Sequence, residues 1–136
     1  RMDSIQCAVV LAKLKVFDQE LAQREAIAAR YDSAFRGHVE TIRVKQDRTS
    51  VHAQYTLFVD GRDEFQKALA AKSVPTAVHY PIPVTRQPAY GHLDSAAYVH
   101  SESAAARVIS LPMSPYLSAA DQDAVIEAVL DAVKQA

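Results

Sequence analysis

The sequence predicts an α+β fold, in which a long N-terminal helix precedes a small antiparallel sheet of three to four strands backed by helices. Three observations predict it. Residues 2–36 contain no proline or glycine and carry apolar residues at helical spacing. Short runs rich in β-branched and aromatic residues follow, bounded by glycine, proline or aspartate. An amphipathic segment after Ser118 closes the chain as a helix.

The first helix is expected to run from Met2 to about Phe35. Asp3 with Gln6 matches a helix N-cap and its reciprocal partner, and Gly37 ends the pattern. A helix of this length is expected to bend or break near residues 17–18. Its first half is apolar over an arc too wide for one sheet to bury, which predicts an interface element. The residues that spread over this arc are Val9, Val10, Leu11, Leu14, Val16 and Phe17.

Local patterns predict the remaining elements. In chain order they are strands at 41–44 and 51–59, a helix at 62–71, a strand at 74–80, a helix at 95–106, a strand at 107–111 and the closing helix. Ser118 is the expected N-cap of that helix, with Asp121 and Asp123 in its first turn, where the helix dipole favours carboxylates.

Composition narrows the classes of function. The 136 residues carry a formal net charge of −1 and are 49% hydrophobic, as in an ordinary globular domain. Without a basic excess or a Lys/Arg run, a nucleic-acid partner is not expected. No apolar stretch is long enough to span a bilayer. The single cysteine, Cys7, forms no internal disulfide and favours a reducing cytoplasm. Because Arg1 directly precedes a helical pattern, we expect the chain to be part of a longer protein.

The residues by themselves contain no complete catalytic set. His92 and His100 have no cysteine or carboxylate cluster at zinc spacing, so a metal site is not expected. Glycine occurs only at positions 37, 61 and 91, which excludes a glycine-rich phosphate loop. From these observations alone, the chain would be an accessory or small-molecule-binding domain.

A proline-rich segment at residues 79–90 is the most distinctive local feature. Three prolines in eight residues fix the backbone and remove donors, which predicts a rigid, extended loop. The loop carries His79, Tyr80, Arg86 and Tyr90 and follows a predicted strand, an arrangement that suits a binding surface. The alternative is a connector whose aromatic side chains pack on the body of the domain.

Three motifs resemble one known family. Residues 1–8 resemble R-[LM]-D-x-[LI]-Q-A-A, with Cys7 in place of the first alanine. Residues 79–90 resemble H-Y-P-x-P-x-H-x-Q-P-A-[YF], and residues 110–117 resemble S-L-P-[ML]-x-P-x-[LM]. On these motifs the chain is identified as a member of the DegT/StrS family of sugar-nucleotide aminotransferases, which use pyridoxal 5'-phosphate (PLP).

The resemblance implies a type I PLP-aminotransferase fold. Residues 1–136 would be its C-terminal small domain with the long helix that leads into it. The Schiff-base lysine, the aspartate that pairs with the pyridine nitrogen and the aromatic residue that stacks on the ring would all lie upstream. The chain alone would therefore hold no catalytic residue, show no PLP aldimine absorbance and be inactive. In the full protein, PLP would be bound mainly by the upstream domain. The full protein would be a homodimer whose subunits share their active sites.

The resemblance also implies a few binding residues. Arg1 would lie beside the partner subunit's cofactor site, where a guanidinium suits a phosphate or a carboxylate. His79 and Tyr80 would line the substrate entrance and contact the sugar nucleotide. Thr85 stands where the family often has histidine. Arg86, which follows it, would meet a diphosphate or a uronic-acid carboxylate, and its alternative is a solvated loop charge.

The implied reaction is transfer of an amino group from glutamate to a keto-sugar nucleotide. The nearest resemblance is to enzymes that aminate a UDP-linked 3-keto uronic acid in lipopolysaccharide sugar pathways of the cytoplasm. A 4-keto-6-deoxy sugar nucleotide is one alternative substrate. A non-catalytic regulatory or binding member of the same family is the other alternative.

Overall fold

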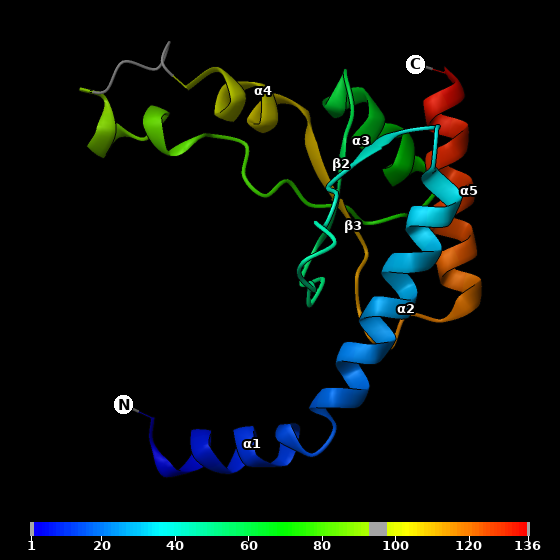
Figure 1. The fold of residues 1–136 in the computed structure, drawn as a ribbon. Helices are drawn as coiled ribbons and strands as arrows, with labels where there is room; N and C mark the ends of the chain where they lie inside the picture. The colour runs from blue at the N-terminus through cyan, green and yellow to red at the C-terminus, as the bar shows by residue number, and fades with distance from the viewer. Residues whose placement is uncertain (1, 93–97, 136) are drawn as a thin grey trace.

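The computed structural model describes residues 2–92 and 98–135 (Figure 1). The helices are α1 (Ser4–Leu14), α2 (Phe17–Phe35), α3 (Arg62–Ala71), α4 (Val99–Arg107) and α5 (Ala119–Gln135), and two short 3-10 turns are η1 (Val84–Arg86) and η2 (Pro88–Tyr90). The strands are β1 (Glu40–Thr41), β2 (Tyr55–Phe58) and β3 (Val108–Leu111). No helix within these residues is long and apolar enough to cross a membrane.

The strands form one antiparallel sheet in the order β1-β2-β3. This confirms the predicted α+β class. The strand expected at 74–80 is wrong, because its pairing is reduced to an isolated bridge between Ala77 and Ser110. The Ala77 amide donates to the Ser110 carbonyl at 3.1 Å, and the Ser110 amide donates back at 2.7 Å. Pro75 and Pro81 flank this bridge and have no N–H to extend the ladder.

Helices α2, α3 and α5 cover one face of the sheet and enclose the core. Side chains at alternate positions of β2 and β3, among them Leu57 and Ile109, point into it. Tyr31 and Phe35 from α2 stack with ring centroids 5.5 Å apart. The largest fully buried side chains are Tyr31, Phe35, Leu57, Leu69, Ile109 and Val129. The opposite face of β2 and β3 does not contribute to this core and can contact other parts of the chain.

The expected long N-terminal helix is broken into two, close to the position predicted. The amides of Lys15 and Val16 bond three residues back, to the carbonyls of Ala12 and Lys13, so α1 ends in a tight turn before α2 begins. The predicted capping box is confirmed, since the Gln6 amide donates to Asp3 Oδ1 at 2.8 Å. In Figure 1, α1 projects away from the body, and none of its residues is buried.

The other predicted helices and strands agree with the structure to different degrees. The helix at 62–71 and the Ser118 cap are confirmed, the latter because the Asp121 amide donates to Ser118 Oγ at 3.1 Å. The strands expected at 41–44 and 51–59 shrink to β1 and β2. The intervening side chains of Ile42, Val44 and Val51 are exposed and have no sheet to pack on. Residues 93–97, at the start of the helix expected at 95–106, lie outside the described residues.

Candidate functional site

The proline-rich loop forms an arm that leaves the body of the domain. After the bridge at Ala77 the chain runs outward through η1 and η2, and α4 brings it back to β3 (Figure 1). The arm and α1 project toward the same side of the figure. The predicted loop is therefore present, but η1 and η2 interrupt its extended course, and its inner end is bridged to the sheet at Ala77.

His79 is tied to the sheet by two buried hydroxyl groups. Its Nδ1 atom lies 3.2 Å from Ser110 Oγ, and Ser110 Oγ lies 3.0 Å from Thr56 Oγ1. Thr56 and Ser110 are direct partners in the antiparallel register of β2 and β3, so their side chains share one face of the sheet. That face is opposite the one that Leu57 and Ile109 bury. The imidazole is thus held by rigid strands rather than by the loop alone.

A cavity of about 330 Å³ lies beside this imidazole. His79, Gln54, Thr76 and Ser110 supply its polar groups, and Met113 is among its apolar residues. The Gln66 amide donates to Thr76 Oγ1 at 3.1 Å, which fixes that hydroxyl at the wall. Within the part of the chain that the structure describes, the lining of this cavity offers hydrogen-bonding groups but no amine and no carboxylate. Its full lining is Ala53, Gln54, Pro75, Thr76, Ala77, His79, Ser110, Leu111, Pro112 and Met113.

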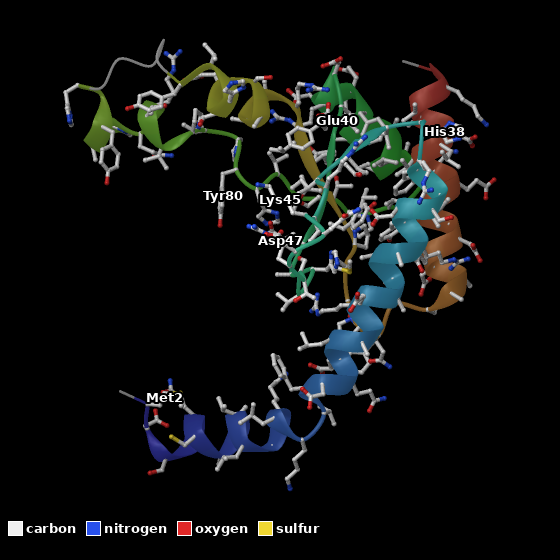
Figure 2. The ribbon with its side chains drawn as sticks, in the orientation of Figure 1. Met2, His38, Glu40, Lys45, Asp47 and Tyr80 are labelled. Atoms are coloured by element: carbon white, nitrogen blue, oxygen red, sulfur yellow. The ribbon has the colours of Figure 1, made fainter. Side chains whose placement is uncertain are left out.

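Tyr80 lies next to His79 and is largely in solvent. Its side chain is 74% exposed, and Figure 2 shows it projecting from the loop. The two rings meet edge to face with centroids 5.8 Å apart, and the peptide bond between them is cis. An exposed aromatic ring next to an imidazole can stack on a ligand while the imidazole donates or accepts a hydrogen bond.

Arg86 lies farther along the arm and is ion-paired. Its Nε atom donates to Glu102 Oε1 on α4 at 2.8 Å, so the pair joins η1 to α4. The neighbouring Thr85 hydroxyl is buried without a hydrogen-bond partner among the described residues. Both side chains of the pair remain partly exposed, so the guanidinium can still be approached from solvent.

The structure describes three of the four expected site residues, and their surroundings differ. The structure brings His79 and Tyr80 together, puts Arg86 in a pair with Glu102, and leaves Arg1 outside the described residues. The sequence analysis missed Thr56 and Ser110. Ser110 opens the third motif, but nothing in the sequence marked Thr56, because its role depends on strand register.

A second cavity, of about 700 Å³, lies between α2 and residues 39–52. Charges of both signs line it, including Asp32, Arg36 and Lys45. The Tyr55 hydroxyl donates to Asp32 Oδ1 at 2.7 Å, and burial together with this carboxylate raises the pKa of Tyr55. Of the expected site residues that the structure describes, none lines this cavity. Within the described residues, no cluster of three or more His, Cys, Asp or Glu side chains could hold a metal ion.

Comparison with known proteins points to one family. The sequence model of the DegT/DnrJ/EryC1/StrS aminotransferase family matches residues 1–130. The chain is 43% identical over 121 residues to the UDP-2-acetamido-2-deoxy-3-oxo-D-glucuronate aminotransferase of Pseudomonas aeruginosa, covering 88% of this chain and 33% of that protein. It is 34% identical over 132 residues to the dTDP-3-amino-3,6-dideoxy-alpha-D-galactopyranose transaminase of Aneurinibacillus thermoaerophilus, covering 95% of this chain and 36% of that protein.

The fold has equally close counterparts among solved structures. The crystal structure of DesV from S. venezuelae, in complex with a ketimine intermediate, superposes with a TM-score of 0.96 and 31% sequence identity, covering 100% of this chain and 38% of that chain. The chain thus spans about a third of the length of the curated relatives it matches.

Proposed function

Because the chain belongs to the DegT/DnrJ/EryC1/StrS aminotransferase family, we propose that it is the C-terminal domain of an enzyme that aminates a keto-sugar nucleotide. The amino donor in this proposal is glutamate, and the acceptor is a UDP-linked 3-keto uronic acid used for lipopolysaccharide sugars. The observation that carries the proposal is the 43% identity to a relative named for a UDP-linked 3-oxo-glucuronate. The 34% identity to a dTDP-sugar transaminase supports a dTDP-linked deoxy sugar as the second candidate.

His79 and Tyr80 bind the sugar nucleotide in this proposal. The imidazole is anchored at Nδ1 by Ser110, and its Nε2 atom has no hydrogen-bond partner among the described residues. Nε2 is thus available to a ligand at the wall of the cavity. The exposed Tyr80 ring beside it offers a face for a sugar or a base. Rigid anchoring of the pair reduces the ordering entropy that binding would otherwise cost.

Arg86 recognises the anionic part of the substrate in this proposal. A guanidinium matches a carboxylate or a diphosphate through two parallel hydrogen bonds. Glu102 occupies the Nε atom, and no contact within the described residues occupies the terminal amino groups. Arg1, for which the structure describes no position, serves the partner subunit's site in the same proposal.

PLP is the cofactor that the family implies. When bound, it acts as the electron sink for amino-group transfer. The cavity beside His79 does not fit it, because that cavity offers no amine for a Schiff base and no carboxylate for the pyridine nitrogen. Lys45 lines the larger cavity, but it lies on an exposed loop. We therefore assign the cofactor to parts of the full protein outside this chain, and this domain to substrate recognition.

The proposal extends to assembly and compartment. The full protein is a homodimer with shared active sites, since α1 leaves apolar side chains such as Ile5 and Leu11 exposed. The single Cys7 is compatible with a reducing cytoplasm, where we place the enzyme.

The deciding experiment supplies the full-length protein with PLP, glutamate and a panel of keto-sugar nucleotides, and measures 2-oxoglutarate. We expect the UDP-linked 3-keto uronic acid to give the highest kcat/KM. Preference for a dTDP-linked deoxy sugar would select the second candidate, and no product with any substrate would refute the enzymatic function. The 136-residue chain alone should lose PLP on dialysis, and retention of a yellow aldimine colour would contradict our assignment of the cofactor.

A further inference from the structure

The buried hydroxyl pair behind His79 is more than a packing contact. Thr56 and Ser110 are only 8% and 4% exposed, so their side chains are largely shielded from bulk water. Both lie on the sheet face that carries the binding loop, and Ser110 bonds Thr56 on one side and His79 on the other. Three polar groups in a row can share their protons in three ways: the protons all run toward His79, all run toward Thr56, or Ser110 accepts from both neighbours.

The proton count selects one direction. Each hydroxyl has one proton to donate, and a neutral imidazole has one protonated and one unprotonated nitrogen. If Thr56 donates to Ser110 and Ser110 donates to Nδ1 of His79, both hydroxyl protons have acceptors at the observed distances of 3.0 and 3.2 Å. In the reverse direction the Thr56 proton would have no acceptor among the described residues, and if Ser110 accepted from both neighbours its own proton would have none. An unsatisfied buried donor is costly, so the first direction is favoured.

We propose that Ser110 is a positioning residue whose hydroxyl, hydrogen-bonded to Thr56, holds His79 in the neutral tautomer protonated at Nε2. The inference rests on the proposed function for its biological meaning, because it turns His79 into a fixed N–H donor at the cavity wall. The partner of such a donor is an acceptor oxygen, and phosphate, carboxylate and hydroxyl oxygens of a sugar nucleotide all qualify.

The location of the pair explains why the tautomer would be held firmly. Thr56 is β-branched and sits in a paired strand, so its χ1 angle, and with it the position of the hydroxyl oxygen, is restricted. Ser110 is fixed by two backbone bonds to Ala77, which lies two residues before His79. The loop can therefore move little at this point without breaking the chain of hydrogen bonds.

The test uses the full-length enzyme with 15N-labelled histidine. The shifts of the two ring nitrogens distinguish a protonated from an unprotonated nitrogen, and loss of a signal in His79→Gln assigns His79. We expect the proton on Nε2 in the wild type. Ser110→Ala removes the hydroxyl that donates to Nδ1, so it should lower the Nε2–H fraction. It should also raise KM for the nucleotide sugar about fivefold with kcat nearly unchanged, as expected for one lost hydrogen bond.

Two further variants separate positioning from mere stability. Ser110→Thr restores a hydroxyl at the same position and should restore both the tautomer and KM. Thr41→Val, on the neighbouring strand β1 and away from the cavity, should change neither. A wild-type His79 protonated at Nδ1, or a tautomer unchanged in Ser110→Ala, would overturn the inference. If the enzyme aminates no sugar nucleotide, the proposed function fails. The nitrogen shifts would still show whether the hydroxyl chain holds His79 in the proposed tautomer.

Discussion

The Nε atom of Arg86 lies 2.8 Å from Oε1 of Glu102, joining the proline-rich arm to α4. The arginine side chain is 57% exposed, and exposed ion pairs of this kind contribute at most about 1 kcal/mol. A substrate carboxylate or diphosphate that presents two oxygens would therefore compete well for the guanidinium. In the proposed enzyme, Glu102 holds Arg86 in place between turnovers and yields it to the anion.

The first prediction separates these two partners of Arg86. Arg86→Gln should raise KM for the uronic-acid substrate about tenfold, as expected for the loss of one charge-assisted contact. Glu102→Gln should leave KM unchanged or lower it, because it removes the competing carboxylate. Steady-state kinetics with a neutral-sugar analogue provide the control, since Arg86→Gln should affect it less if the sugar carboxylate is the partner. An equal rise of KM in both variants would mean that the Arg86–Glu102 pair only stabilises the conformation of the arm and does not bind the substrate.

The second prediction concerns Tyr80. Because its side chain is 74% exposed, Tyr80→Ala should change the free energy of unfolding by no more than about 0.5 kcal/mol. It should nevertheless raise KM for the nucleotide sugar about tenfold, given the usual contribution of a stacked ring. Tyr116→Ala is the matched control, since Tyr116 is 70% exposed and lies on the segment before α5. A similar KM effect in both variants would argue against a specific role for Tyr80.

The sequence predicted those features that depend on neighbouring residues. The capping box of Asp3 and Gln6 and the Ser118 cap are each made within three residues, so their pattern is visible in the chain itself. The family motifs located the loop with His79 and Tyr80. The strand expected at 74–80 was wrong because two prolines limited its pairing to a single bridge.

The features that escaped prediction depend on pairing across the chain. Thr56 and Ser110 are separated by 54 positions and meet only through the register of β2 and β3. The partner of Arg86, Glu102, is 16 residues away on another element. No local pattern distinguishes these hydroxyl and carboxylate groups from solvated ones, so their roles became visible only in the folded structure.

The third prediction concerns the stability of the folded chain at alkaline pH, which depends on a tyrosine in the core. Burial raises the pKa of Tyr31 from its ordinary value of 10.0 to about 12, against the nearby Arg30 charge, which lowers it. The folded state therefore keeps the phenol proton after the unfolded chain has lost it. The stabilisation is fully present below pH 10 and is lost as pH rises from 10 to 12, by up to about 2–3 kcal/mol.

Urea unfolding of the chain between pH 8 and about pH 11.5 measures this loss. Tyr31→Phe removes the ionisable group, so its stability should fall less steeply above pH 10 than that of the wild type. At neutral pH the variant should be less stable by about 1 kcal/mol, because the Tyr31 hydroxyl donates to the Pro112 carbonyl. Parallel alkaline curves for the two proteins would show that Tyr31 does not contribute.

The fourth prediction concerns α1 as an interface element. Ile5, Leu11 and Leu14 are 79%, 64% and 57% exposed, and no residue of α1 is buried. Apolar surface that stays in solvent favours association, so a second subunit or the rest of the protein should cover this helix. Leu14→Glu places a charge at the centre of the expected contact and should weaken dimerisation of the full-length protein at least tenfold, since a buried unpaired charge is costly.

Sedimentation of the full-length protein over a range of concentrations measures this effect. Gln19→Glu adds the same charge at an exposed polar position of α2 and should leave the dimer unchanged. The 136-residue chain alone should self-associate through α1, and Leu14→Glu should reduce that association too. A strictly monomeric chain in light scattering, together with an unaffected Leu14→Glu dimer, would show that the apolar arc of α1 is not an interface. Because the arm and α1 project toward the same side of the body, loss of the dimer would also be expected to raise KM for the nucleotide sugar.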